Sequence, residues 1–192
     1  INLTADRHSL IQINPEISAT VSWFNGGEGA YALVSDTKPY QISSTWDSNN
    51  FCDVYLVSME DGSKTTIFKK LNGNPSVSPA GKYLAWYSYD DLGWHTYRIA
   101  DGQSLNVTAA AGVAFHDEED DHPDVPPTVD RPHWLEGDEA FIISDKFDIW
   151  KFQPDGKYAV NLTEGKGRAN NWQLSYTSIQ ASDISSILSK TG

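Results

Sequence analysis

The residues of this chain best suited to chemistry form one acidic run. It holds six carboxylates and two imidazoles within nine residues, His116-Asp117-Glu118-Glu119-Asp120-Asp121-His122-Pro123-Asp124. Hard cations such as calcium prefer carboxylate oxygens, and zinc would use the imidazoles. The spacing has neither the central glycine and terminal glutamate of a calcium loop nor a His-Glu-x-x-His pair. We therefore expect a solvated acidic loop without a cofactor, and a divalent cation bound at 116–124 is the alternative.

Two insertions interrupt the pattern of the chain and carry the other binding candidates. The first spans 36–52, and the second spans 109–130 and includes the acidic run. Insertions of this kind become loops, where binding residues concentrate. The candidate binding residues are Trp46, Asp47, His116, Asp117, Glu118, Asp121, His122 and Arg131.

Nucleophilic catalysis has no support in the sequence. No Gly-x-Ser-x-Gly segment occurs, so the nucleophile elbow of serine hydrolases is absent. None of the five histidines lies in a recognisable triad sequence, and no motif surrounds the single cysteine, Cys52. We expect Cys52 to be a buried, inert thiol and the chain to have no catalytic residue.

Composition narrows the classes of partner. The formal net charge is −12, from 26 acidic and 14 basic residues, whereas proteins that bind nucleic acids or anionic membranes need a basic surface. A single cysteine excludes an internal disulfide. No apolar stretch approaches the roughly 20 residues needed to span a bilayer, and the first residues do not resemble a signal peptide.

The elements that position the candidate residues recur along the chain. Segments 21–35, 75–88 and 132–144 each read as an apolar strand, a glycine-containing turn and an apolar strand ending in serine. A second hairpin follows each segment and is centred on an Asp-Gly pair, the strongest short hairpin signal. Those pairs are Asp61-Gly62, Asp101-Gly102 and Asp155-Gly156.

Asn-x-Thr tripeptides mark the ends of these units. Two units close on 106–108 and 161–163, and 2–4 looks like the end of an earlier unit. Each tripeptide is also a glycosylation sequon. Because they recur at one place in the repeat, we expect a structural role at a turn or strand end.

The repeat predicts an all-β fold built from β-propeller blades. Trp23, Val77 and Trp134 occupy equivalent positions about 55 residues apart, and four strands in such a period are typical of a blade. We expect a partial propeller over 1–171, with about three complete four-stranded antiparallel blades near 19–70, 75–108 and 131–163. Residues 172–192 are expected to form a tail, with a short helix at 181–190, or to begin a further blade.

Propellers have about four to eight blades, and an open arc leaves sheet edges unpaired. We therefore expect these blades to belong to a larger ring of seven or eight, or to complete a ring by self-association.

Three segments resemble a known family. Ser76–Trp86 is similar to the "SPDGKYLAF" strand of TolB-like and prolyl-oligopeptidase-family propellers, with Ala80 in place of the aspartate. Segment 148–163 resembles their "DIW…DG…NLT" ending, and Phe115–Pro127 resembles a linker of bacterial prolyl-oligopeptidase-like peptidases. The resemblance covers roughly 1–165. It implies a propeller that gates and positions peptides for an α/β-hydrolase domain bearing a Ser-Asp-His triad.

The chain departs from that family because it contains no hydrolase domain, so no catalytic residue is carried over. The helical motif that binds substrate amino termini in dipeptidyl peptidases is also missing. We expect a non-catalytic propeller segment of a prolyl-oligopeptidase-like serine peptidase, periplasmic or extracellular in a bacterium. Its role would be to gate or position a peptide substrate and to contact a hydrolase domain of the same parent or of another protein. Two alternatives are a TolB-like protein-binding module and a metal-assisted propeller enzyme that uses 116–124.

Overall fold

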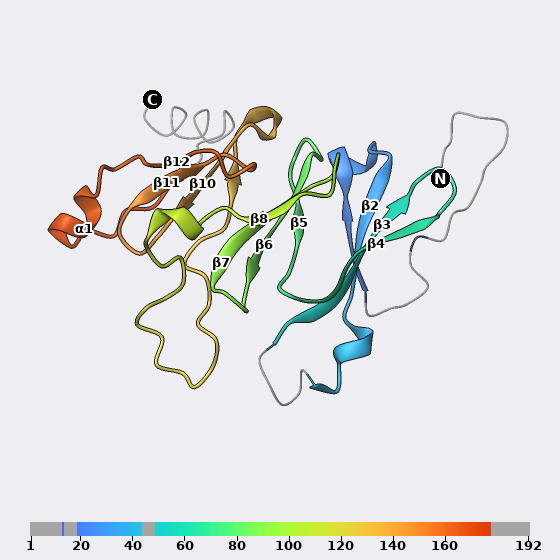
Figure 1. The fold of residues 1–192 in the computed structure, drawn as a ribbon, viewed down its shortest axis with the longest axis horizontal. Coiled ribbons are helices and arrows are strands. Elements are labelled where there is room, and N and C mark those ends of the chain that lie inside the picture. Colours follow the sequence, from blue (N-terminus) through green and yellow to red (C-terminus); the bar gives the residue numbers. More distant parts are fainter. Residues whose placement is uncertain (1–12, 14–18, 44–48, 178–192) are drawn as a thin grey trace, which may run out of the picture.

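Three four-stranded antiparallel sheets make up the computed structural model of the chain (Figure 1). The structure describes residues 13, 19–43 and 49–177, and every structural statement below concerns these residues. Within each sheet, strands that follow one another in the sequence are neighbours, in the orders β1-β2-β3-β4, β5-β6-β7-β8 and β9-β10-β11-β12. This architecture confirms the predicted all-β fold of propeller blades.

We call the three sheets the first, second and third blades. The first comprises β1 (Ala19–Trp23), β2 (Tyr31–Asp36), β3 (Phe51–Ser58) and β4 (Lys64–Asn72). The second comprises β5 (Ser76–Val77), β6 (Tyr83–Ser88), β7 (Gly93–Arg98) and β8 (Ser104–Asn106). The third comprises β9 (His133–Trp134), β10 (Phe141–Ser144), β11 (Ile149–Phe152) and β12 (Ala159–Asn161). Short helices η1 (Phe24–Gly27), η2 (Lys38–Tyr40), η4 (Ala109–Ala111), η5 (Glu136–Asp138) and α1 (Lys166–Asn170) lie between or after the strands.

The strand register confirms the alignment of the repeats. Trp23, Val77 and Trp134 are each the last residue of the first strand of a blade. They pair with Ala32, Leu84 and Phe141 in the second strand, so the three residues occupy the same place in the sheet.

The Asp-Gly pairs form the same turn in every blade. Gly62, Gly102 and Gly156 have φ of 73°, 74° and 72°, a left-handed conformation that glycine adopts without steric cost. All three turns join the third and fourth strands of a blade, which is where the sequence predicted the second hairpin.

The Asn-x-Thr tripeptides clasp the ends of the second and third blades. Asn106 Oδ1 accepts hydrogen bonds from the backbone N–H and the hydroxyl of Thr108, and Thr108 Oγ1 accepts a bond from Trp94 N at 2.9 Å. Asn161 and Thr163 repeat the arrangement with the backbone N–H of β11. The expected structural role is confirmed for these two; Asn2 lies outside the described residues.

Neighbouring blades pack face to face through two apolar clusters. Between the first and second blades, Leu33, Val54 and Leu56 meet Leu84. Between the second and third blades, Tyr87 and Trp94 meet Phe141, Ile143 and Phe152, with Phe115 of the linker in the same cluster. Trp94 and Trp150 both pack in this second interface.

One buried carboxylate joins the second blade to the third. Asp138, 1% exposed, accepts hydrogen bonds from Ser78 Oγ, Ala80 N and Lys82 N. By register, Asp138 corresponds to Gly81 in the second blade, and Gly81 lies against Phe24 of the first. The same contact between blades is therefore polar at one interface and apolar at the other.

The chain after β12 turns into α1 and then crosses beside the third blade. Leu174 N donates to Phe147 O at 3.1 Å, and the ring of Tyr176 contacts that of His133. Residues 164–177 hold no strand, so the start of a further blade is not found there. The helix expected at 181–190 lies outside the described residues.

We expect Asp138→Asn to lower the free energy of unfolding by about 2–3 kcal/mol. Asparagine keeps the shape of the side chain and tolerates the left-handed φ of 58° at this position. Its amide replaces one acceptor oxygen with an NH₂ group, which is a donor and faces the hydrogen-bond donors of the second blade. Urea denaturation measures the change. The exposed neighbour Glu139→Gln is the control and should stay within about 0.5 kcal/mol of the parent. Equal stability of the two variants would show that the hydrogen bonds of Asp138 between the second and third blades do not stabilise the fold.

Candidate functional site

Loops gather at one end of the three blades, which we call the loop end. It comprises the β2–β3, β6–β7 and β10–β11 connections, the linker from β8 to β9, and α1. The η2 segment and the linker both project below the sheets in the view of Figure 1. The first insertion separates β2 from β3, as predicted. The opposite end of the blades carries the tight Asp-Gly turns.

A closed base holds the acidic loop in place. Phe115 is 1% exposed and packs edge-on against the rings of Trp150 and Phe152. Val129 N donates to Phe115 O at 3.0 Å, and His116 and Thr128 form an isolated antiparallel bridge. Residues 117–127 are therefore displayed between two anchored chain segments.

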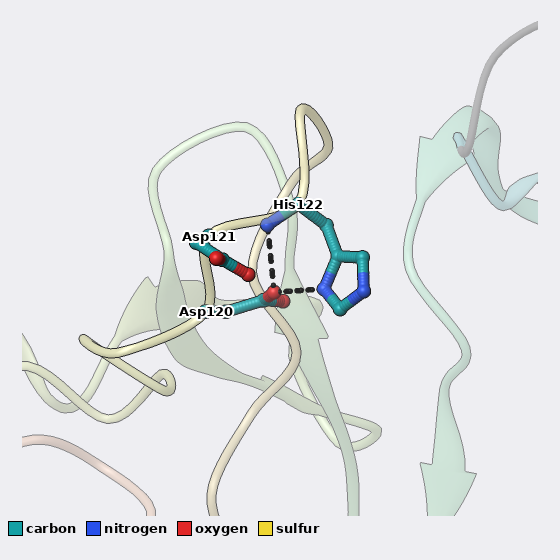
Figure 2. Close-up of side chains that lie close together, drawn as sticks. All are labelled: Asp120, Asp121 and His122. Atoms are coloured by element: carbon teal, nitrogen blue, oxygen red, sulfur yellow. Dashed lines mark hydrogen bonds and ion pairs between the residues drawn. The ribbon is translucent and has the colours of Figure 1, made fainter.

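Three potential metal ligands meet within the acidic loop (Figure 2). One ligand atom each of Asp120, Asp121 and His122 lies within 4.8 Å of the others, and no other such trio occurs among the described residues. His122 N donates to Asp120 Oδ1 at 3.1 Å, and the His122 ring contacts the same oxygen through Nδ1. The hydrogen bond to Asp120 raises the pKa of His122 and lowers that of Asp120.

The structure separates the remaining sequence-predicted residues. His116 belongs to the base of the loop, and its Nδ1 is buried without a hydrogen-bond partner among the described residues. Asp117 accepts a bond from Glu119 N at 3.0 Å, and Glu118 lines a cavity between two blades. Arg131 is exposed, with its backbone N–H on Asp130. Of the predicted set, the structure brings together only Asp121 and His122, while Trp46 and Asp47 lie outside the described residues.

Four cavities open at the loop end. The largest of these four, about 410 Å³, lies between the end of the second blade, the linker that follows it and α1, which follows the third blade, and we call it the inter-blade cavity. Its lining includes Asp91, Gly93, Asn106, Thr108, Glu118 and Arg168. Cavities of about 330 and 280 Å³ flank Lys146 and Gln173, and one of about 230 Å³ lies beside η2.

Two buried carboxylates support the wall of the inter-blade cavity. Asp148 accepts hydrogen bonds from Thr163 Oγ1 at 2.6 Å and Gly167 N at 2.9 Å. Burial alone would raise the pKa of Asp148, but these hydrogen bonds outweigh burial and lower it. Asp145 accepts a bond from Trp150 Nε1 at 2.9 Å and lies 3.5 Å from the Arg168 guanidinium. The "DIW…NLT" pattern contained Asp148, Trp150 and Thr163 of this cluster, whereas Asp145, Gly167 and Arg168 lie outside it.

A serine, a histidine and an aspartate meet beside β10 without forming a triad. Asp130 contacts His133 Nε2 at 3.1 Å and accepts a bond from the backbone N–H of Ser144 at 2.9 Å. Ser144 Oγ is buried and has no hydrogen-bond partner in the described part of the chain. The imidazole therefore does not act on this hydroxyl, and Asp130 serves to tie the linker to β10.

No protein-family model and no curated protein matches the chain. Among solved structures, it is similar to TolB from Acinetobacter baumannii, with a TM-score of 0.44 and 16% identity over 74% of this chain. The match covers 31% of that structure's chain, so this sequence spans about a third of its length. No helix among the described residues is long and apolar enough to cross a membrane.

We expect the His122 imidazole to titrate above its ordinary pKa of about 6.5, because the Asp120 carboxylate stabilises the protonated ring. Asp120→Asn should return the titration toward the ordinary value. NMR of the ring protons over pH 5–9 measures the midpoint. Asp121→Asn is the matched control, since Asp121 makes no hydrogen bond to the ring. A midpoint that is unchanged in Asp120→Asn would show that the pair does not form in solution.

Proposed function

We propose that this chain is a non-catalytic β-propeller segment whose loop end binds a protein or peptide. The observation that carries the proposal is the gathering of both insertions and four cavities at one end of the three four-stranded sheets. Binding residues concentrate on loops that a rigid scaffold positions. The opposite end offers only short turns between strands.

The charge of the loop end favours a basic partner. The acidic run places six carboxylates on a loop whose described residues are mostly exposed. Clustered charge of one sign steers an oppositely charged partner and selects against partners of like charge. Lys146 pairs with Glu119 and neutralises one of the six carboxylates, which leaves an excess of negative charge on the loop.

The environments of Cys52 and Ser144 support a role without nucleophilic catalysis. Burial raises the pKa of Cys52 to about 11, and its thiol donates to Gly73 O at 3.4 Å. Cys52 is therefore protonated at neutral pH and shielded from solvent. Ser144, which lies beside the Asp130–His133 pair, makes no hydrogen bond to the imidazole.

In its finer form, the proposal makes the partner an α/β-hydrolase domain of a prolyl-oligopeptidase-like peptidase, periplasmic or extracellular in a bacterium. The resemblance of segments 76–86 and 148–163 to that family supports this form. The three blades would then belong to a larger ring. Trp23 is 50% exposed, whereas Trp134 at the equivalent position stacks on Tyr83 of the neighbouring blade.

A metal-assisted activity is the second candidate, and the trio of Asp120, Asp121 and His122 favours it. Equilibrium dialysis of the chain against calcium or zinc chloride tests this candidate. Saturable binding of one ion that is lost in His122→Ala would favour the metal-assisted form over the proposal above.

We expect no serine of this chain to react with a fluorophosphonate probe, because no described serine hydroxyl is hydrogen-bonded to an imidazole. Ser63 and Ser78 donate only to carboxylates. In-gel fluorescence after labelling, with a known serine hydrolase as positive control, measures the reaction. Labelling that heat denaturation abolishes would contradict the non-catalytic role.

We expect a photo-crosslinking amino acid at Asp124, on the acidic loop, to capture a protein in bacterial cells. The same residue at Glu60, in the exposed β3–β4 turn at the opposite end, is the matched control. Adducts that form from Asp124 and not from Glu60, detected by immunoblotting and mass spectrometry, would support binding at the loop end. Equal capture from both positions, or none from Asp124, would overturn it.

A further inference from the structure

We propose that the inter-blade cavity binds the basic side chain, lysine or arginine, of a peptide segment. This inference rests on the proposed function and names the chemistry that the loop end recognises. The cavity combines the negative charge of Glu118 and Asp91, an arginine that is already paired with a carboxylate, and a lining of small residues. Each of these features restricts which ligand fits.

The negative charge comes from two carboxylates on separate elements. Glu118, on the acidic loop, is exposed and forms no hydrogen bond or ion pair with any described residue. Asp91, on the β6–β7 turn, lies 2.8 Å from His95 Nε2 and accepts a bond from Asn106 Nδ2 at 3.0 Å, yet its side chain is still 46% exposed. Both carboxylates therefore have acceptor capacity left for a donor that enters the cavity.

Asp91 is held in its charged form. Burial would raise its pKa, but hydrogen bonds from Ser88, His95 and Asn106 outweigh burial and lower the pKa. A cation that enters the cavity at neutral pH therefore meets an ionised carboxylate.

The cation that lines the cavity does not cancel this charge. Arg168 lies 3.5 Å from the buried Asp145 carboxylate, and its guanidinium stacks over the Phe147 ring at 4.8 Å. The buried Asp145 carboxylate balances the charge of Arg168, while the Arg168 side chain remains 42% exposed. A guanidinium has five N–H donors, so Arg168 can still donate to a neutral acceptor such as a peptide carbonyl.

The size of the cavity favours a side chain over a bare ion. Glycine and alanine residues line it beside the charged groups, which leaves about 410 Å³. Ligand pockets of this size accept organic groups. A bare metal ion would need several converging ligand atoms, and Asp91 and Glu118 belong to no such trio among the described residues. An anion is disfavoured because the acidic loop forms one wall.

The probes are three pentapeptides with blocked ends, identical except for a central lysine, arginine or norleucine. Backbone ¹H–¹⁵N chemical shifts of the 192-residue chain report binding at Gly93 and Gly112, which line the cavity. We expect saturable shifts at both amides with lysine and arginine and none with norleucine. Unshifted amides with all three peptides would overturn the inference.

Two matched variants separate the cavity from the general charge of the loop. Glu118→Gln should weaken binding of the lysine peptide by about tenfold, as expected for loss of a charge-assisted hydrogen bond. Asp124→Asn removes one charge from the same loop outside the cavity and should stay within about twofold of the parent. Equal weakening by both variants would show that net charge, and not the cavity, attracts the peptide.

Asp91→Asn is a third variant, used only if its ¹H–¹⁵N spectrum shows the parent fold, because Asp91 also holds His95 and Asn106. Its loss of affinity would add to the support from Glu118→Gln. The crosslinking experiment keeps this inference distinct from the proposed function. Capture from Asp124 together with unshifted cavity amides would overturn the cavity assignment and leave the loop-end proposal standing.

Discussion

The burial of Phe115 between the second and third blades is the interaction on which the loop end depends. Burial of an aromatic side chain of this size removes a large apolar area from water. The ring of Phe115 packs edge-on against the rings of Trp150 and Phe152. Because Phe115 is anchored, Val129 and Thr128 can pair back onto the same stretch of linker. The acidic loop then projects as a closed unit, and Glu118 reaches the cavity between the blades.

Carboxylates in this chain serve two different purposes. Asp138 and Asp148 are buried, and each accepts several hydrogen bonds that tie one chain segment to another. Asp145 is also buried and accepts hydrogen bonds within its own turn and from Trp150 Nε1. A buried charge is costly unless hydrogen-bond partners satisfy it, so these residues have a structural role. The carboxylates of the acidic loop are mostly exposed and lie at the loop end. The net charge of −12 therefore comes both from buried carboxylates with structural hydrogen bonds and from the exposed acidic loop.

The repeat tolerates different chemistry at the same contact between blades. Ser78 meets Asp138 where, one interface earlier, Phe24 meets the bare backbone of Gly81. A hydrogen-bonded pair and an apolar contact can replace one another because each satisfies the groups it buries.

Local patterns in the sequence determined the blades, because hairpins depend on near neighbours in the chain. The Asp-Gly turns and the register of Trp23, Val77 and Trp134 could be read from the residues alone. Only the tertiary structure decided which acidic residues work together. The acidic run looked like one site, yet its members divide among the trio at Asp120, the ion pair of Glu119 with Lys146 and the inter-blade cavity. The cavity brings together Asp91 of the second blade, Glu118 of the linker and Arg168 of α1. Their proximity depends on how the sheets pack, which no spacing along the chain encodes.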